Sequence, residues 1–106
     1  MTLYPPLLKR GITLMPSLIL IPQWAKGNAA YLAHEMVHVD QQRAFGTLTF
    51  WRRYLFDKAF RQTREVEAYK AQIAAGASLV GCATSLATEY RLDLTTAQAM
   101  ALLEKL

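Results

Sequence analysis

The chain has 106 residues, of which 53% are hydrophobic and 19% are charged. This length corresponds to a single domain, and the apolar content excludes a disordered chain. The single cysteine, Cys82, excludes an intrachain disulfide and any zinc or redox site that needs two cysteines. The net charge of +4 favours anionic partners such as nucleic acid or a lipid surface, but it carries no information about the fold.

Residues 1–10 predict an N-terminal arm, because two adjacent prolines interrupt regular structure there. The arm does not resemble a secretory signal, since its basic residues follow the apolar ones, and we therefore expect a cytoplasmic protein. Residues 12–21 are rich in large aliphatic side chains and predict one or two short strands, with Pro16 at a bend or on an edge. A loop is expected over residues 23–27.

The rest of the chain predicts helices, which are placed by their capping residues. Asn28 predicts the start of a helix that runs to about residue 45, where Gly46 ends it. The later segments are a helix capped by Thr47 or Thr49 and ending near residue 56, a helix over 60–75 ended by Gly76, a helical segment over 78–88, and a helix over 96–105 that starts with a capping box of Thr95 and Gln98. The prediction is a mainly α domain with a minor strand element.

Residues 71–88 carry no charge and approach the length that crosses a bilayer. They consist mostly of small residues, with only four large aliphatic ones. This composition favours two closely packed helices, and a transmembrane helix is the alternative.

The main chemical signal is an HExxH pattern at residues 34–38, within the first predicted helix. His34 and His38 are one helical turn apart on the same face, so both imidazoles can reach one metal ion. Glu35 lies beside them and can act as a general base on a metal-bound water. Neutral imidazole suits Zn²⁺, and a catalytic zinc needs a third protein ligand and an open position. The alternative is a chance pattern in an ordinary buried helix.

The third ligand must come from elsewhere in the chain, because no third histidine exists, and the candidates are the carboxylates downstream of His38. Asp40 lies two residues beyond His38 in the same helix, so it points away from both imidazoles. In the helix predicted over 60–75, Glu65 borders the apolar face and Glu67 points toward the far side. Glu65 is therefore the favoured ligand and Glu67 the alternative, while an ion pair between Glu65 and Arg61 is the competing interpretation.

These residues resemble the gluzincin group of zinc metallopeptidases. In that group the HExxH helix is followed by a helix that carries a glutamate ligand, often in an E-x-x-A-D or E-x-x-x-D motif. Residues 65–69 (EVEAY) match the first motif up to Ala68, and the match assigns the ligand to Glu65. Tyr69 stands where the family has an aspartate that hydrogen-bonds a ligand histidine, so we expect its hydroxyl to orient a histidine or to contact a substrate oxygen.

Residues 34–72 also resemble small uncharacterised HExxH proteins of bacterial and phage genomes. The two resemblances imply a minimal zincin-like peptidase over residues 1–106, which binds Zn²⁺ and hydrolyses peptides or proteins. They also imply that residues 12–21 lie beside the site, because an edge strand in related peptidases pairs with an extended substrate. A second copy or a protein partner is the candidate for completing the cleft, since little sequence remains to build a further subdomain.

Two other functions fit the sequence. The zinc could serve only to stabilise the fold of a non-catalytic structural or interaction protein, for example a phage-associated one, because a bound metal stabilises a small fold. The basic residues interleaved with aromatic ones over 50–64 could bind nucleic acid or an anionic membrane, although core aromatics beside a solvated arginine face are the preferred interpretation. Gln41 and Gln42 are candidate hydrogen-bond donors to the metal ligands, with solvent-facing amides as the alternative.

Overall fold

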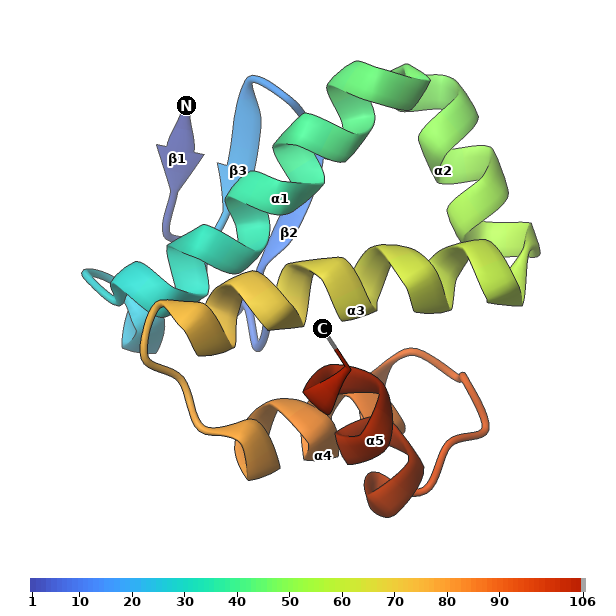
Figure 1. The fold of residues 1–106 in the computed structure, drawn as a ribbon. Helices are drawn as coiled ribbons and strands as arrows, with labels where there is room; N and C mark the ends of the chain where they lie inside the picture. The colour runs from blue at the N-terminus through green and yellow to red at the C-terminus, as the bar shows by residue number, and fades with distance from the viewer. Residues whose placement is uncertain (106) are drawn as a thin grey trace.

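The computed structural model describes residues 1–105 of the chain. Its elements in chain order are β1 (Thr2–Leu3), β2 (Ile12–Met15), β3 (Leu18–Leu20), the 3-10 helix η1 (Gln23–Ala25), α1 (Ala29–Phe45), α2 (Thr47–Phe56), α3 (Lys58–Ala74), α4 (Leu79–Glu89) and α5 (Thr96–Glu104). Figure 1 shows α3 crossing the molecule, with α1 and the sheet on one side and α4 and α5 on the other. The fold is mainly α with a small sheet, which confirms the predicted fold class.

The sheet has three strands in the order β1-β3-β2, with β1 parallel and β2 antiparallel to β3. Pro16 lies between β2 and β3, at the predicted bend. The prediction that residues 1–10 form only an arm is wrong for its first residues. The backbone N–H of Ile19 donates to Met1 at 2.8 Å and that of Ile21 to Leu3 at 2.9 Å, so the start of the chain pairs with β3.

The two ends of α1 lie where the sequence predicts them. The Asn28 side chain accepts a hydrogen bond from the backbone N–H of Tyr31 at 3.0 Å. Gly46 ends the helix with a φ of +82°, a conformation that glycine adopts without a Cβ penalty. Gly46 is also the N-cap of α2, so the prediction that Thr47 or Thr49 caps this helix is wrong. A single residue separates α1 from α2, which leaves no position for a threonine cap.

The later helices start at side-chain caps. The Asp57 side chain accepts from the N–H of Phe60 at 3.1 Å, so α3 begins two residues before the predicted start. Ser78 caps α4 in the same way. The predicted capping box at the start of α5 is confirmed, because the side chains of Thr95 and Gln98 each accept a hydrogen bond from the backbone N–H of the other.

Most of the core lies between α3, α4 and α5. Its buried residues are Tyr69, Cys82, Ala83, Leu86, Leu92, Ala99 and Leu103. A second cluster packs the sheet against α1 through Ile19, Ile21, Ala25 and Val39. Residues 71–88 are divided between α3 and α4, and among residues 1–105 no helix is long and apolar enough to cross a membrane.

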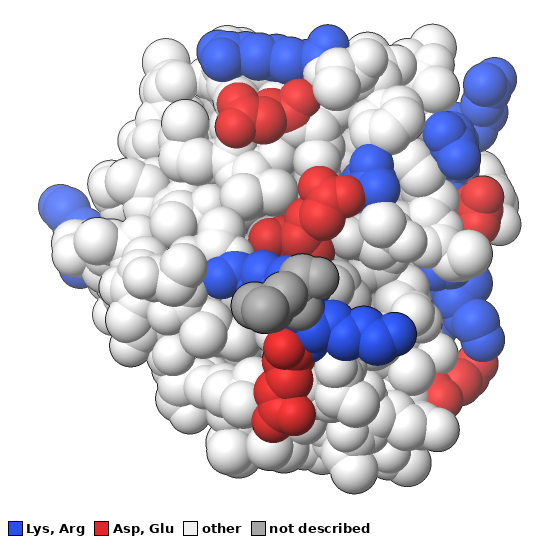
Figure 2. All heavy atoms as spheres, in the orientation of Figure 1, with Lys and Arg blue, Asp and Glu red and all other residues white. Residues whose placement is uncertain are grey.

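The basic and aromatic residues of α2 and α3 pack against each other. Phe50 and Phe60 are buried, and the guanidinium of Arg53 lies 4.3 Å from the centre of the Phe60 ring. Arg64 lies 5.0 Å from the same ring. Figure 2 shows positive and negative side chains interspersed on one face of the molecule, with no continuous basic surface there. These contacts agree with the interpretation of this stretch as core aromatics beside arginines.

Candidate metal centre

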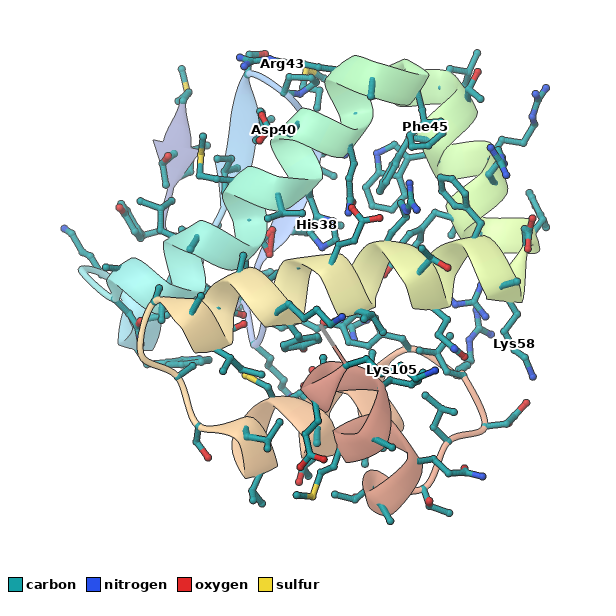
Figure 3. The ribbon with its side chains drawn as sticks, viewed as in Figure 1. His38, Asp40, Arg43, Phe45, Lys58 and Lys105 are labelled. Carbon is teal, nitrogen blue, oxygen red and sulfur yellow. The ribbon has the colours of Figure 1, made fainter. Side chains whose placement is uncertain are left out.

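Three buried side chains from α1 and α3 converge on one point. His34, His38 and Glu65 each offer a ligand atom, and these atoms all lie within 4.8 Å of one another. The Nε2 atom of His34 is 3.2 Å from Oε1 of Glu65, and Nε2 of His38 is 3.2 Å from Oε2. Figure 3 shows His38 pointing from α1 toward α3. Asp40 is exposed, as its position in the helix predicts. The group could hold a metal ion.

The chemistry of the group fits a cation. Glu65 Oε1 is buried and receives no hydrogen bond from any residue in the part of the chain that the structure describes. Buried carboxylate oxygens are normally paired, because leaving one without a partner is costly. Two imidazoles and one carboxylate are also a donor set that divalent metals accept. A cation between the three side chains would satisfy the oxygen that lacks a donor.

Electrostatics within the group point the same way. Burial alone would lower the pKa of His38, but the charge of Glu65 and its hydrogen bond raise that pKa to about 9. Burial alone would raise the pKa of Glu65, but the two histidines hold it well below its usual range. The group therefore favours positive charge between the rings and the carboxylate, where a bound metal ion would replace a proton.

His38 is oriented by a network on its far side. Its Nδ1 atom lies 2.8 Å from Oε1 of Gln41. The amide of Gln41 donates to the Arg64 carbonyl at 3.0 Å and to Glu67 at 3.3 Å, so its oxygen must face the histidine. Nδ1 of His38 then carries a hydrogen, and Nε2 is the ring atom that faces Glu65. Gln41 is thus an acceptor for His38, rather than the donor expected from the sequence.

Glu67 and Gln42 lie outside the group. The Glu67 side chain is 47% exposed and pairs with Arg64 at 2.8 Å. It reaches the centre only through Gln41, whereas Glu65 makes the direct contacts. The Gln42 amide donates to the Thr13 carbonyl at 2.6 Å, which ties α1 to β2 and leaves the histidines untouched.

Tyr54 of α2 is a member of the site that the sequence analysis missed. Its hydroxyl donates to Oε2 of Glu65 at 2.5 Å, and its ring stacks on Phe50. Burial, and then the charge of Glu65, raise the pKa of the Tyr54 hydroxyl, so it remains a donor. No sequence pattern marks this residue, because the contact depends on how α2 packs on α3.

Tyr69 reaches His34 with its ring. The two ring centres are 4.3 Å apart at 72°. The Tyr69 hydroxyl lies 2.8 Å from that of Tyr90 and 3.5 Å from Glu89, so it does not bond a ligand histidine as expected from the family motif. Nδ1 of His34 is buried and has no hydrogen-bond partner among residues 1–105. The contact of Tyr69 with His34 is therefore an edge-to-face aromatic one.

Strand β2 holds Glu35 in position. Thr13 Oγ1 donates to the Glu35 carboxylate at 3.0 Å and lies 3.2 Å from its backbone carbonyl. Gly11 lies so close that a Cβ atom there would be 2.8 Å from Glu35 Oε1. Glu35 is 2% exposed, and burial raises its pKa although His38, His34 and Thr13 act in the opposite direction. A fixed carboxylate of raised pKa is suited to accepting a proton.

A cavity of about 340 Å³ opens onto this arrangement. Its wall includes His34, Glu35, His38, Glu65 and Tyr54. The carboxylate of Glu35 and the candidate metal-binding group therefore face the same space, where a small part of a ligand could lie beside both.

Strand β2 is the edge strand beside the site, as the resemblance to peptidases implies. Side chains of the helices already bond three of the backbone groups in this part of the chain. These bonds join Gly11 N–H to the Tyr31 hydroxyl, the Thr13 carbonyl to Gln42, and the Leu14 carbonyl to Trp51. An extended substrate that paired with β2 as a further strand would compete with them.

Replacing Gln41 by leucine is expected to weaken metal binding by about 10- to 100-fold, the usual effect of removing a group that orients a ligand histidine. Without the amide, His38 loses the acceptor that fixes its Nδ1 hydrogen. Competition with a chromogenic zinc chelator measures the change. Gln62→Leu on α3, whose side chain makes no hydrogen bond within residues 1–105, should bind zinc like the wild type. Equal affinities of both variants would show that Gln41 does not orient the ligand.

No protein family, curated protein or solved structure matches this chain.

Proposed function

We propose that the protein is a zinc-dependent peptidase of minimal size. The observation that carries this proposal is the shared cavity, in which the buried carboxylate of Glu35 faces the same space as His34, His38 and Glu65. The gluzincin-like spacing of these residues supports the same reaction class.

Zinc is the metal that this donor set favours. Two imidazoles and one glutamate are the protein ligands of a well-known type of catalytic zinc site, and three protein ligands leave a fourth position open. A structural zinc is normally enclosed by four protein ligands. Three ligands beside a cavity therefore favour catalysis over a metal staple, the second function considered from the sequence.

The chain's own residues would carry the proton through hydrolysis. A bound zinc would supply Lewis acidity, which lowers the pKa of a nearby water and polarises a substrate carbonyl. Glu35 would accept the proton of the attacking water and deliver it to the leaving amine. Thr13 holds its carboxylate in place for both transfers, and the absence of a Cβ atom at Gly11 leaves room for it. Tyr54 and Gln41 keep Glu65 and His38 directed at the metal position.

Metal removal and reloading test this proposal. Protein purified without a metal-affinity step is depleted with a chelator, and separate samples receive one equivalent of zinc or of magnesium. Each sample is incubated with a mixture of peptides of known sequence, and mass spectrometry identifies the products. We expect cleavage with zinc only. Equal cleavage by the depleted protein, or no cleavage after zinc has bound, would contradict the proposal.

A further inference from the structure

Three arginines line the cavity together with the metal-binding group. Arg10 lies just before β2, Arg61 belongs to α3, and Arg91 lies in the loop between α4 and α5. Within residues 1–105, none of the three forms an ion pair with a carboxylate. We propose that these arginines bind a carboxylate group of the substrate beside the metal centre.

Arg61 is fixed in position by neutral acceptors. It lies one helical turn before Glu65 on α3, but the two side chains do not form the ion pair considered from the sequence. Its guanidinium donates to the carbonyls of Tyr90 at 2.8 Å, Tyr54 at 2.8 Å and Arg91 at 3.3 Å. These carbonyls orient the group without neutralising its charge. A guanidinium has five N–H donors, so two remain for a ligand.

The loop after α4 has an unusual backbone conformation that places two carbonyls beside Arg61. Figure 1 shows it passing below the N-terminal half of α3. Arg91 and Asp93 have φ values of +52° and +58°, which are uncommon for residues other than glycine. Unusual backbone conformations of this kind often mark functional sites. Here the loop directs two successive carbonyls at Arg61.

Arg10 is held where α4 ends and the same loop begins. It donates to the Glu89 carbonyl at 2.7 Å, and its guanidinium lies 5.2 Å from the centre of the Tyr90 ring. Both partners are again uncharged groups. Arg10 and Arg61 thus face the cavity from two elements, with Tyr90 bonded to one and stacked under the other.

The charge of the cavity favours an anionic ligand once a metal is bound. Its wall contains three arginines and three glutamates, the glutamates being Glu35, Glu65 and Glu89. A divalent cation at the metal-binding group leaves the wall with an excess of positive charge. In a partly closed cavity such an excess attracts an anion, and arginine forks match the geometry of a carboxylate.

Two parts of a peptide could supply the carboxylate, namely the free C-terminus or an aspartate or glutamate side chain. The inference rests on the proposed function, because that function makes a peptide the ligand. Binding can nevertheless be measured without cleavage, in zinc-loaded Glu35→Gln protein, which retains the cavity and lacks the proton acceptor.

Three acetylated six-residue peptides of alanine and leucine serve as probes. One ends in a free carboxylate, one ends in an amide, and one ends in an amide and carries a single internal glutamate. Titration followed by NMR gives the dissociation constants. We expect at least one carboxylate peptide to bind about tenfold or more tightly than the uncharged one. The peptide that binds more tightly than the uncharged one shows whether the bound carboxylate comes from the chain end or from the acidic side chain.

Substitutions in the Glu35→Gln background assign the effect to the arginines. Arg61→Gln should abolish the preference, and Arg61→Lys should restore it only in part, because lysine lacks the planar fork. Arg52→Gln is the matched control, since Arg52 is exposed on α2 and does not line the cavity. If the Arg61 variants do not fold, the same measurement is made on Arg91→Asn. Asparagine is chosen because it tolerates the positive φ of this position.

Equal binding of all three peptides would overturn the inference. So would a preference that persists in folded Arg61→Gln, Arg91→Asn and Arg10→Gln proteins, because the carboxylate would then bind without the arginines. Failure of the proposed function is distinguishable from both results. In that case wild-type protein cleaves nothing, while the arginine-dependent preference remains.

Discussion

Replacing Glu35 by glutamine is expected to lower zinc-dependent peptide hydrolysis by about 10²- to 10⁴-fold, the range that a positioned acid–base group contributes. The amide has nearly the same shape as the carboxylate and can still accept the hydrogen bond of Thr13, but it cannot take up a proton. Zinc content and melting temperature should stay close to those of the wild type, since Glu35 is not among the three ligands.

The control for this substitution is Glu104→Gln, the same chemical change on the exposed surface of α5. Initial rates of cleavage are compared at equal zinc occupancy, so that a loss of metal cannot imitate a loss of catalysis. Equal rates for wild type and Glu35→Gln would contradict the assignment of Glu35 as general base. A loss of zinc in Glu35→Gln would instead indicate that Glu35 helps to bind the metal.

Replacing Glu65 by alanine is expected to weaken zinc binding by more than the roughly 10- to 100-fold expected when a group that only orients a ligand is lost. The substitution removes one of three ligands and the partner of both His34 and His38. At free zinc 100 times its dissociation constant, binding adds about 2.7 kcal/mol to the free energy of unfolding. This increment should disappear in Glu65→Ala, and chemical denaturation with and without zinc measures it.

Glu67→Ala is the matched control, because Glu67 lies two residues away on α3 and its side chain is half exposed. It contacts the centre only through Gln41, so we expect most of the zinc-dependent stabilisation to remain. If Glu67→Ala abolished the stabilisation and Glu65→Ala retained it, the two glutamates would have exchanged roles.

The parts of the fold that the sequence predicts correctly depend on local contacts. Asn28 bonds a backbone N–H three residues away, and Thr95 and Gln98 bond each other across the same spacing. The placing of Glu65 rather than Glu67 toward the histidines follows from the period of a single helix. Errors occur where an element depends on distant residues. Residues 2–3 form a strand only because β3 lies beside them.

The environment of the centre could not be predicted from one sequence for the same reason. Tyr54 meets Glu65 only because α2 packs against α3, and Arg61 finds its acceptors partly in a loop that follows α4. Tyr69 shows the limit of a motif match. It occupies the position of the family's aspartate, yet its hydroxyl bonds Tyr90 and its ring packs on His34.

The most direct test of the metal centre is the position of zinc in a crystal of the zinc-loaded protein, located by anomalous scattering at the zinc edge. We expect one strong peak bounded by Nε2 of His34, Nε2 of His38 and the carboxylate of Glu65, at the usual ligand distances of about 2.0–2.2 Å. No peak, or a peak bound by Glu67 or other exposed carboxylates in place of these three side chains, would contradict it.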